Sequence, residues 1–313
     1  MAYGVPGMPQ LAQHLRASKP EDLDTPASEI WGRFLAAAEE YDLEAALTRE
    51  SMPDSLTNHI VKETWKFLIK SDLAHFQKNI SNRDINPLTN LFRYLLRTVK
   101  KEIDVVTTNY DRLAEYAAES GGIHHFTGFG YGHLRTWHGS ESTHLLIGRR
   151  PVATANVWKV HGSLDWFQTA DRTVIGLPVT GVLPAGLLPS IVTPGVEKYR
   201  ITHGEPYRTI LDRADRAMSN AQSYLCIGFG FNDQHIQPKL VQKCERDEVP
   251  LVVITKKLSE QARSFLRRGS CRQYMALEES AGGTCMYTQG HPDGIEISGH
   301  NLWSLQGFLQ LAI

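Results

Sequence analysis

The sequence predicts an α/β fold in which a parallel sheet is flanked by helices and interrupted by a helical insertion subdomain. Short apolar runs of strand length end in polar or glycine-containing turns, and segments with helical spacing follow them. By contrast, residues 19–100 show helical patterns only. We therefore expect residues 1–18 and 101–313 to form the sheet domain, and residues 19–100 to form a helical subdomain inserted into it.

The overall composition is that of a globular protein. The chain has 313 residues, of which 42% are hydrophobic and 21% are charged, and this suits one large domain or a core domain with an insertion. The formal net charge of -1 gives no global attraction to nucleic acid or to an anionic membrane. No apolar run approaches the length of a membrane span, and no signal-peptide pattern opens the chain. We expect a cytoplasmic protein that contacts neither membrane nor nucleic acid directly.

The cysteines and histidines form no recognised metal-binding pattern. Cys226, Cys244, Cys271 and Cys285 are widely scattered, so they are expected to be reduced, packed thiols. Several histidines lie in the glycine-rich region 121–144, where a metal site is conceivable. Their spacings match no ligand set, so a mobile loop with surface histidines is the default interpretation.

The first hundred residues are predicted to contain turns and helices. A turn-forming segment with Gly4 and Gly7 precedes a helix at residues 10–16. Breaks at Pro53 and at Asn86-Pro87 divide the following region into three or four helices. Such an insertion either covers a pocket, provides a surface for a partner, or serves only as packing.

The most informative stretch ends the first predicted strand. An apolar run at residues 103–106 leads into polar side chains that include Thr108, Asn109 and Asp111, and a helix is predicted at 112–119. Ligands of open α/β sheets bind beyond the carboxyl ends of the strands. An amide and a carboxylate placed there can hold a sugar or an activated water. Alternatively, Asn109 and Asp111 only cap the helix that follows.

A second predicted strand, residues 156–160, ends in His161-Gly162. The glycine permits a sharp backbone turn, and a histidine at such a position can act as a general base near neutral pH. A lone histidine is more often structural. Two polar strand ends, at Asn109 and His161, favour a functional site.

A third apolar strand, residues 223–227, runs into Gly228 and Gly230 and then into Asn232 and Asp233. The glycines allow a ligand to approach the backbone closely. As a phosphate loop the motif is weak, because it lacks the lysine of a P-loop.

The remaining segments continue the alternation of helices and strands. Residues 173–194 are predicted to be irregular or short β structure. Helices are predicted at 207–222, 236–246, 259–268 and 300–311, and strands at 249–255 and 271–277.

Taken together, these stretches resemble the sirtuin-like NAD-consuming domains, in particular the sirtuin-like proteins of bacterial anti-phage defence. The matching segments are Gly4-Val5-Pro6, Thr107-Thr108-Asn109-Tyr110-Asp111, His161-Gly162 and residues 228–233, in the order of the family. The first strand end followed by Lys-Val-His-Gly-Ser-Leu-Asp-Trp is typical of the defence branch. The resemblance implies a Rossmann-like parallel sheet flanked by helices, with a helical insertion subdomain.

The resemblance also implies roles for individual residues. Asn109 would hold the nicotinamide ribose and the attacking water, and His161 would act as the base or orient the ribose hydroxyls. Asp111 would support the nicotinamide side of the ligand. The residues expected to contact NAD are Gly4, Thr108, Asp111, Gly162, Gly228, Gly230, Asn232 and Asp233.

The implied activity is hydrolysis of NAD to nicotinamide and ADP-ribose, by an effector that depletes NAD during phage infection. No cofactor is expected beyond NAD as substrate. Sirtuin deacylases carry paired zinc cysteines after the His-Gly, and their absence here argues against deacylation and against zinc. The alternatives are a module that binds NAD or ADP-ribose without cleaving it or serves in assembly and, less favoured, a protein deacylase.

Relatives of this type act in assemblies. The resemblance implies a homo-oligomer and a partner that senses infection, either a hexameric DNA-translocase ATPase or a short Argonaute. The helical subdomain at 19–100 is the expected contact surface. The family's opening strand and Gly-Ala-Gly-x-Ser turn would lie just before Gly4, so we expect the true start to lie further upstream.

Overall fold

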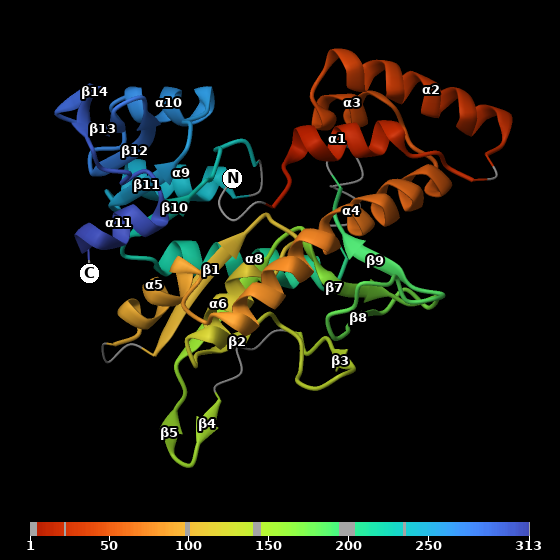
Figure 1. The fold of residues 1–313 in the computed structure, drawn as a ribbon, viewed down its shortest axis with the longest axis horizontal. Helices are drawn as coiled ribbons and strands as arrows, with labels where there is room; N and C mark the ends of the chain where they lie inside the picture. The colour runs from red at the N-terminus through yellow and green to blue at the C-terminus, as the bar shows by residue number, and fades with distance from the viewer. Residues whose placement is uncertain are drawn as a thin grey trace.

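The computed structural model describes residues 5–21, 23–97, 101–139, 145–193, 204–233 and 236–312. It confirms an α/β fold with parallel strands flanked by helices. The described residues form an N-terminal helical group, a central parallel sheet, a small antiparallel sheet and a C-terminal sheet (Figure 1). No helix in these ranges is both long and apolar enough to cross a bilayer.

The N-terminal helices are α1 (Met8–Ala17), α2 (Thr25–Glu40), α3 (Leu43–Arg49), α4 (Asp54–Ser81) and α5 (Pro87–Leu95). Capping side chains explain where several of them begin. Asp24 and Asp42 each accept a backbone N–H of the first turn at 2.8 Å, and Asn86 accepts the N–H of Leu88 at 3.0 Å. Pro53 directly precedes α4, so both predicted breaks are confirmed.

Helices α1, α2, α3 and the beginning of α4 share one apolar core. Leu15 and Phe34 are fully buried in it, beside Leu56 of α4. The sequence prediction counted residues 1–18 with the sheet domain, whereas the packing places α1 among these helices. Helix α5 packs instead on the sheets, where Leu91 and Phe92 are buried.

The central sheet contains β1 (Glu102–Thr107), β6 (Thr154–Lys159) and β2 (His124–Phe126) in the order β1-β6-β2. Both pairs of strands are parallel, and Thr107 lies opposite Lys159 at their carboxyl ends. Helices α6 (Leu113–Ser120) and α8 (Tyr207–Asn220) both contact β6.

The C-terminal sheet has the order β10-β11-β12-β13-β14, with β10 to β12 parallel and the last pairs antiparallel. Its strands are β10 (Tyr224–Ile227), β11 (Leu251–Thr255), β12 (Tyr274–Ser280), β13 (Gly283–Thr288) and β14 (His291–Ser298). Its helices are α9 (Gln237–Arg246), α10 (Glu260–Arg267) and α11 (Leu305–Ala312). The last two strands were not predicted, because β14 is largely exposed and contains proline, aspartate and glycine.

Two apolar cores extend across both sheets, one on each face. Side chains alternate along a strand, so Ala155 and Val157 of β6 share one core with Ile254 of β11. Trp158 of β6 and Val253 of β11 belong to the other. The parallel strands of the predicted sheet are therefore divided between two sheets that share their helical layers.

A small antiparallel sheet has the order β3-β8-β7-β9. Its strands are β3 (Arg135–Thr136), β8 (Val174–Gly176), β7 (Gly162–Gln168) and β9 (Leu188–Ile191). The indole Nε1 of Trp65 in α4 donates to the carbonyl of Leu164 at 2.7 Å and fixes this sheet to the long helix. A hairpin of β4 (Leu146–Ile147) and β5 (Arg150–Pro151) protrudes from the body (Figure 1).

Candidate functional site

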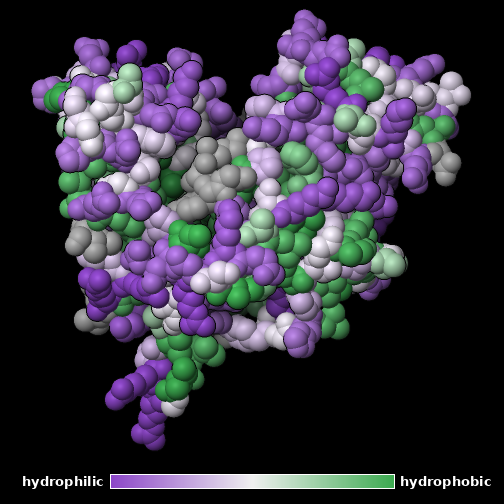
Figure 2. All heavy atoms as spheres, in the orientation of Figure 1, coloured by the Kyte–Doolittle hydropathy of each residue, from purple (hydrophilic) through white to green (hydrophobic). Residues whose placement is uncertain are grey.

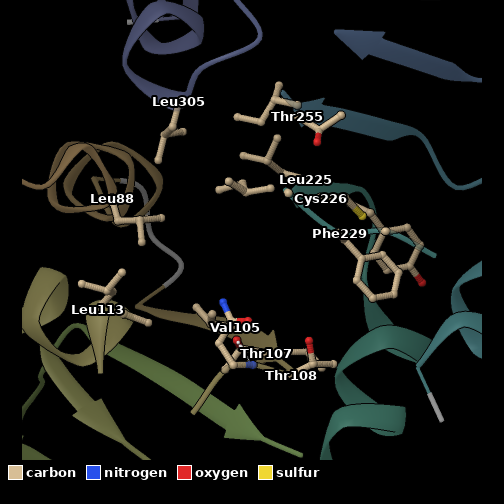
Figure 3. A pocket seen from close by; sticks show the side chains of 18 of the residues that line it. Leu88, Val105, Thr107, Thr108, Leu113, Leu225, Cys226, Phe229, Thr255 and Leu305 are labelled. Atoms are coloured by element: carbon tan, nitrogen blue, oxygen red, sulfur yellow. Dashed lines mark hydrogen bonds between the residues drawn. The ribbon is translucent and has the colours of Figure 1, made fainter. Parts of the chain in front are cut away.

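A cavity of about 2060 Å³ lies between the central and C-terminal sheets and reaches the beginning of α1. The space-filling view shows the molecule hollowed between the C-terminal sheet and the α1–α3 group (Figure 2). In the close-up, leucines from α5, α6, β10 and α11 point into the cavity, and threonines stand at strand ends (Figure 3). The labelled leucines are Leu88, Leu113, Leu225 and Leu305. We call this cavity the inter-sheet cleft.

Asn109 lies in the connection from β1 to α6 and lines the inter-sheet cleft, where it is exposed. Its backbone N–H donates to Oγ1 of Thr107 at 3.1 Å. The next residue, Tyr110, makes two hydrogen bonds. Its hydroxyl donates to the carbonyl of Val192 at 2.6 Å, and its own backbone carbonyl accepts from the N–H of Leu164 at 3.0 Å. The exposed amide of Asn109 is therefore carried by a backbone fixed on either side.

Asp111 also lines the cleft, but its carboxylate takes part in the start of α6. Its Oδ1 accepts the N–H of Leu113, the first residue of α6, at 3.2 Å. The N-cap residue of this helix is Arg112, without a side-chain cap, so neither Asn109 nor Asp111 caps it. Burial raises the pKa of Asp111, and the nearby Lys159 ammonium opposes that rise.

His161 follows β6 and meets a carboxylate from the other side of the cleft. Its Nε2 lies 3.1 Å from Oδ2 of Asp233, and both side chains are less than a tenth exposed. Asp233 is fixed in turn, because its Oδ1 accepts the N–H of Ile236 at 3.1 Å. The resemblance implied that Asp233 contacts NAD, and no pattern in the sequence links it to His161. Nε2 has no hydrogen-bond partner among the described residues, so the contact is one of charge and not of hydrogen-bond geometry. A carboxylate at this distance stabilises the protonated form of an imidazole.

The predicted glycines divide into two groups. Gly228 and Gly230 line the cleft together with Asn232, beyond the carboxyl end of β10. Gly162 is absent from the cleft lining in the described ranges. Its φ is 87°, and a Cβ at this position would lie 2.2 Å from the carbonyl oxygen of Ser190.

Of the remaining predicted NAD contacts, Thr108 lines the cleft, and Gly4 lies outside the described residues. The same cleft therefore collects Thr108, Asn109, Asp111, His161, Gly228, Gly230, Asn232 and Asp233.

Three ion pairs with little exposed surface lie close in sequence to Asp111 and His161 or are linked to them. Arg112 is paired with Asp72 of α4, Lys159 lies 3.2 Å from Glu115, and Arg135 lies 2.6 Å from Asp165. Sequence reasoning missed these pairs, since charged residues are ordinarily expected at the surface.

The cysteines offer no reactive thiol in the cleft. All four are free and three are buried, as the sequence predicted. Cys226 lines the cleft, and burial raises the pKa of its thiol to about 12. Within the part of the chain that the structure describes, no three His, Cys, Asp or Glu side chains are grouped to hold a metal ion. The expectation of a zinc-free site remains a prediction.

Comparison with known protein families shows which family this chain belongs to. Residues 104–269, more than half of the chain, match the family described as the SIR2-like domain. The chain belongs to the SIR2-like domain family.

Two solved structures are similar to this SIR2-like chain. A mutant Sir2 homologue in complex with 2'-O-acetyl ADP ribose is 16% identical, with a TM-score of 0.40, and 72% of each chain is covered. A structure titled for the mechanism and regulation of Sir2 enzymes is 14% identical, with a TM-score of 0.39, and covers 81% of this chain and 86% of the other. A search of curated proteins finds no match.

Proposed function

We propose that this SIR2-like chain is an NAD glycohydrolase, which cleaves NAD to nicotinamide and ADP-ribose. One observation carries the proposal. Asn109 and His161, which follow the neighbouring parallel strands β1 and β6, line the same cleft, and Asp233 stands 3.1 Å from the imidazole. An amide, a base and a carboxylate that stabilises the protonated base are the groups that this hydrolysis needs.

The reaction breaks the bond between the nicotinamide nitrogen and the ribose C1', and the bonding electrons leave with nicotinamide. The sugar carbon becomes cation-like, water adds to it, and one proton is released. The amide of Asn109 would hold the ribose and the water. With its Nε2 3.1 Å from the carboxylate of Asp233, the imidazole of His161 would accept the proton at Nδ1.

Several features of the cleft suit a dinucleotide. Its volume of about 2060 Å³ exceeds that of an ordinary small-molecule pocket, roughly 300–1,000 Å³. Gly7, the N-cap of α1, and Met8, its first residue, line the cleft, and a helix N-terminus attracts phosphate. Gly228 and Gly230 leave room for close approach to the backbone, and the leucines form an apolar wall that limits water.

The first test is nicotinamide release from NAD by the purified chain and by Asn109→Ala and His161→Ala variants. We expect each variant to keep its fold and lose activity by about 10²-fold or more. Asn90→Ala and His133→Ala are matched controls, because both residues are exposed and lie outside the cleft lining. Full activity in both site variants would overturn the proposal.

The breadth of the cleft also favours a second candidate, binding of NAD or ADP-ribose without cleavage. A cavity of about 2060 Å³ is wider than a site that encloses a reacting bond needs to be. Calorimetry that shows tight NAD binding, together with no nicotinamide in the assay, would favour this candidate. Turnover would exclude it.

We further propose that the activity depletes NAD as the effector of an anti-phage defence system. The support is the resemblance of the segments 107–111 and 159–166 to the defence branch of the family. The effector would act as a homo-oligomer in the cytoplasm, with a hexameric DNA-translocase ATPase or a short Argonaute as partner. The helical group is the proposed contact surface.

Measurement of the NAD concentration in phage-infected cells tests this role. NAD should fall in cells that carry the wild-type chain with its genomic neighbours, and it should persist with His161→Ala. A chain that remains a strict monomer in size-exclusion chromatography, alone and with these partners, would count against the assembly.

A further inference from the structure

Lys159 is a charged side chain in an unusual place. It is the last residue of β6, two positions before His161, and none of its surface is exposed. Lysine is almost never fully buried unless it is paired, since removing an ammonium from water is costly. A specific interaction has to offset that cost.

The ammonium of Lys159 contacts two elements at once. Nζ donates a hydrogen bond to the backbone carbonyl of Asp111 and lies 3.2 Å from Oε1 of Glu115 in the first turn of α6. Through its backbone, Lys159 also lies opposite Thr107 at the end of β1. One residue thus connects β6, the β1–α6 loop and α6.

These contacts enclose Asn109. The N–H of Val160 donates to the carbonyl of Thr107 at 3.2 Å, and Lys159 holds the carbonyl of Asp111. Two consecutive residues of the segment that leads to His161 therefore hold the loop on both sides of Asn109.

Charge neutralisation alone does not account for this arrangement. The Oε2 atom of Glu115 is buried and has no hydrogen-bond partner among the described residues, so the pair is incompletely satisfied. Replacing a buried ion pair by apolar side chains is often neutral or stabilising. An apolar side chain cannot, however, donate a hydrogen bond to the carbonyl of Asp111.

We infer that Lys159 is a positioning residue that fixes the loop carrying Asn109 relative to His161. An effect of Lys159 on the reaction rate is expected only if the proposed NAD cleavage is correct. An effect of Lys159 on the position of the loop is inferred from the structure alone. Small displacements of a catalytic group are costly, because a misplacement of about 1 Å can lower a rate 10²-fold.

The experiment compares three proteins: wild type, Glu115→Gln, and the double variant Lys159→Met/Glu115→Gln. Lys159→Met alone would leave the Glu115 carboxylate buried without its partner and could fail to fold. The double variant removes both charges and keeps a side chain of similar length. Glu115→Gln is its matched reference, since it retains the donor to Asp111.

We expect the double variant to melt at or above the temperature of Glu115→Gln, in which the Lys159 ammonium stays buried without its carboxylate partner. Its kcat should nevertheless be about 10- to 100-fold lower, with a smaller change in KM. Amide hydrogen exchange in residues 107–113 should be faster in the double variant than in Glu115→Gln. Equal kcat and equal exchange in the two variants would overturn the inference, as would a double variant that differs only in melting temperature.

The exchange measurement separates this inference from the proposed function. If the wild-type chain releases no nicotinamide, NAD cleavage fails, and faster exchange in residues 107–113 of the double variant still supports the positioning role. If the wild-type chain releases nicotinamide and the double variant exchanges residues 107–113 as slowly as Glu115→Gln, the proposed function is supported and the positioning role of Lys159 is wrong.

Discussion

Asp233 shows how one carboxylate can serve both structure and chemistry. One oxygen accepts the N–H of Ile236 near the start of α9, and the other lies 3.1 Å from His161. The structural contact needs only an acceptor, which an amide also provides. The contact with His161 needs the negative charge, so the two roles can be separated by a single substitution.

We expect Asp233→Asn to fold normally and to release nicotinamide about 10²-fold more slowly. The amide oxygen can still accept from Ile236, but it no longer stabilises a protonated His161. Steady-state kinetics and a melting curve check both parts. Asp212→Asn is the control, because Asp212 is exposed on α8 and pairs only with Arg216 in the described structure. A variant as active as this control would contradict the role given to Asp233.

Gly162 is required for a steric reason, which a pair of variants can demonstrate. Gly162 and Gly186 both have positive φ, at 87° and 75°, but only Gly162 would bring a Cβ against neighbouring atoms. We expect Gly186→Ala to cost about 1 kcal/mol of unfolding free energy. Gly162→Ala should cost about 2 kcal/mol more, since the methyl group would clash with Ser190 and Tyr207. Urea titration measures both, and equal costs would contradict the packing argument.

At the scale of elements, an ion pair holds β3 in the small antiparallel sheet. Arg135 of β3 donates to Oδ2 of Asp165 in β7 and to the carbonyl of Leu177, each at 2.6 Å. Burial alone would raise the pKa of Asp165, but the guanidinium groups of Arg135 and Arg112 outweigh it and hold this pKa well below its usual range.

This shift predicts how stability depends on pH. A carboxyl with a lowered folded-state pKa stabilises the protein above its unfolded pKa, about 3.9, and loses that contribution as the pH falls towards the folded value. We expect Asp165→Asn to lower the unfolding free energy by about 3 kcal/mol at pH 7. The difference from wild type should shrink progressively below about pH 4. Denaturant titrations at pH 7, 4 and 3 test this, and a constant difference would refute it.

The sequence predicted the elements that carry strong local signals. Hydrophobic periodicity predicted the strands that end near Asn109 and His161. Helix-breaking and capping residues predicted the breaks before α4 and α5. Strand β7 was missed because it begins at Gly162, directly after the turn, without a polar boundary. The buried partner of Lys159 was also missed, since burial of a charge depends on tertiary packing and leaves no local pattern.

At the scale of the whole molecule, the candidate site is assembled from segments far apart in the chain. The sequence supplied the residues of the cleft one strand end at a time, because each end is polar or rich in glycine. The sequence does not predict that His161 and Asp233 lie 3.1 Å apart, because this distance depends on how the two sheets are placed relative to each other. Shared helical layers provide that placement.

Because both sheets line the cleft, a ligand bound there should stabilise the entire fold. A ligand at 100 times its dissociation constant adds about 2.7 kcal/mol to the unfolding free energy. We expect NAD to raise the melting temperature of Asn109→Ala, in which slow turnover preserves the ligand. Adenine alone at the same concentration is the control. No shift up to millimolar NAD would mean that the cleft does not bind the dinucleotide.

The division of the parallel strands between two sheets also bears on solubility. Among the described strands, β1 and β10 each have a hydrogen-bonded neighbour on one side only, and both border the cleft with its apolar leucines. An open strand edge is a template for non-native pairing with another chain. We therefore expect aggregation during refolding to begin at these two edges. The helices α5 and α11, which contribute leucines over the cleft, then also act as a shield against misassembly.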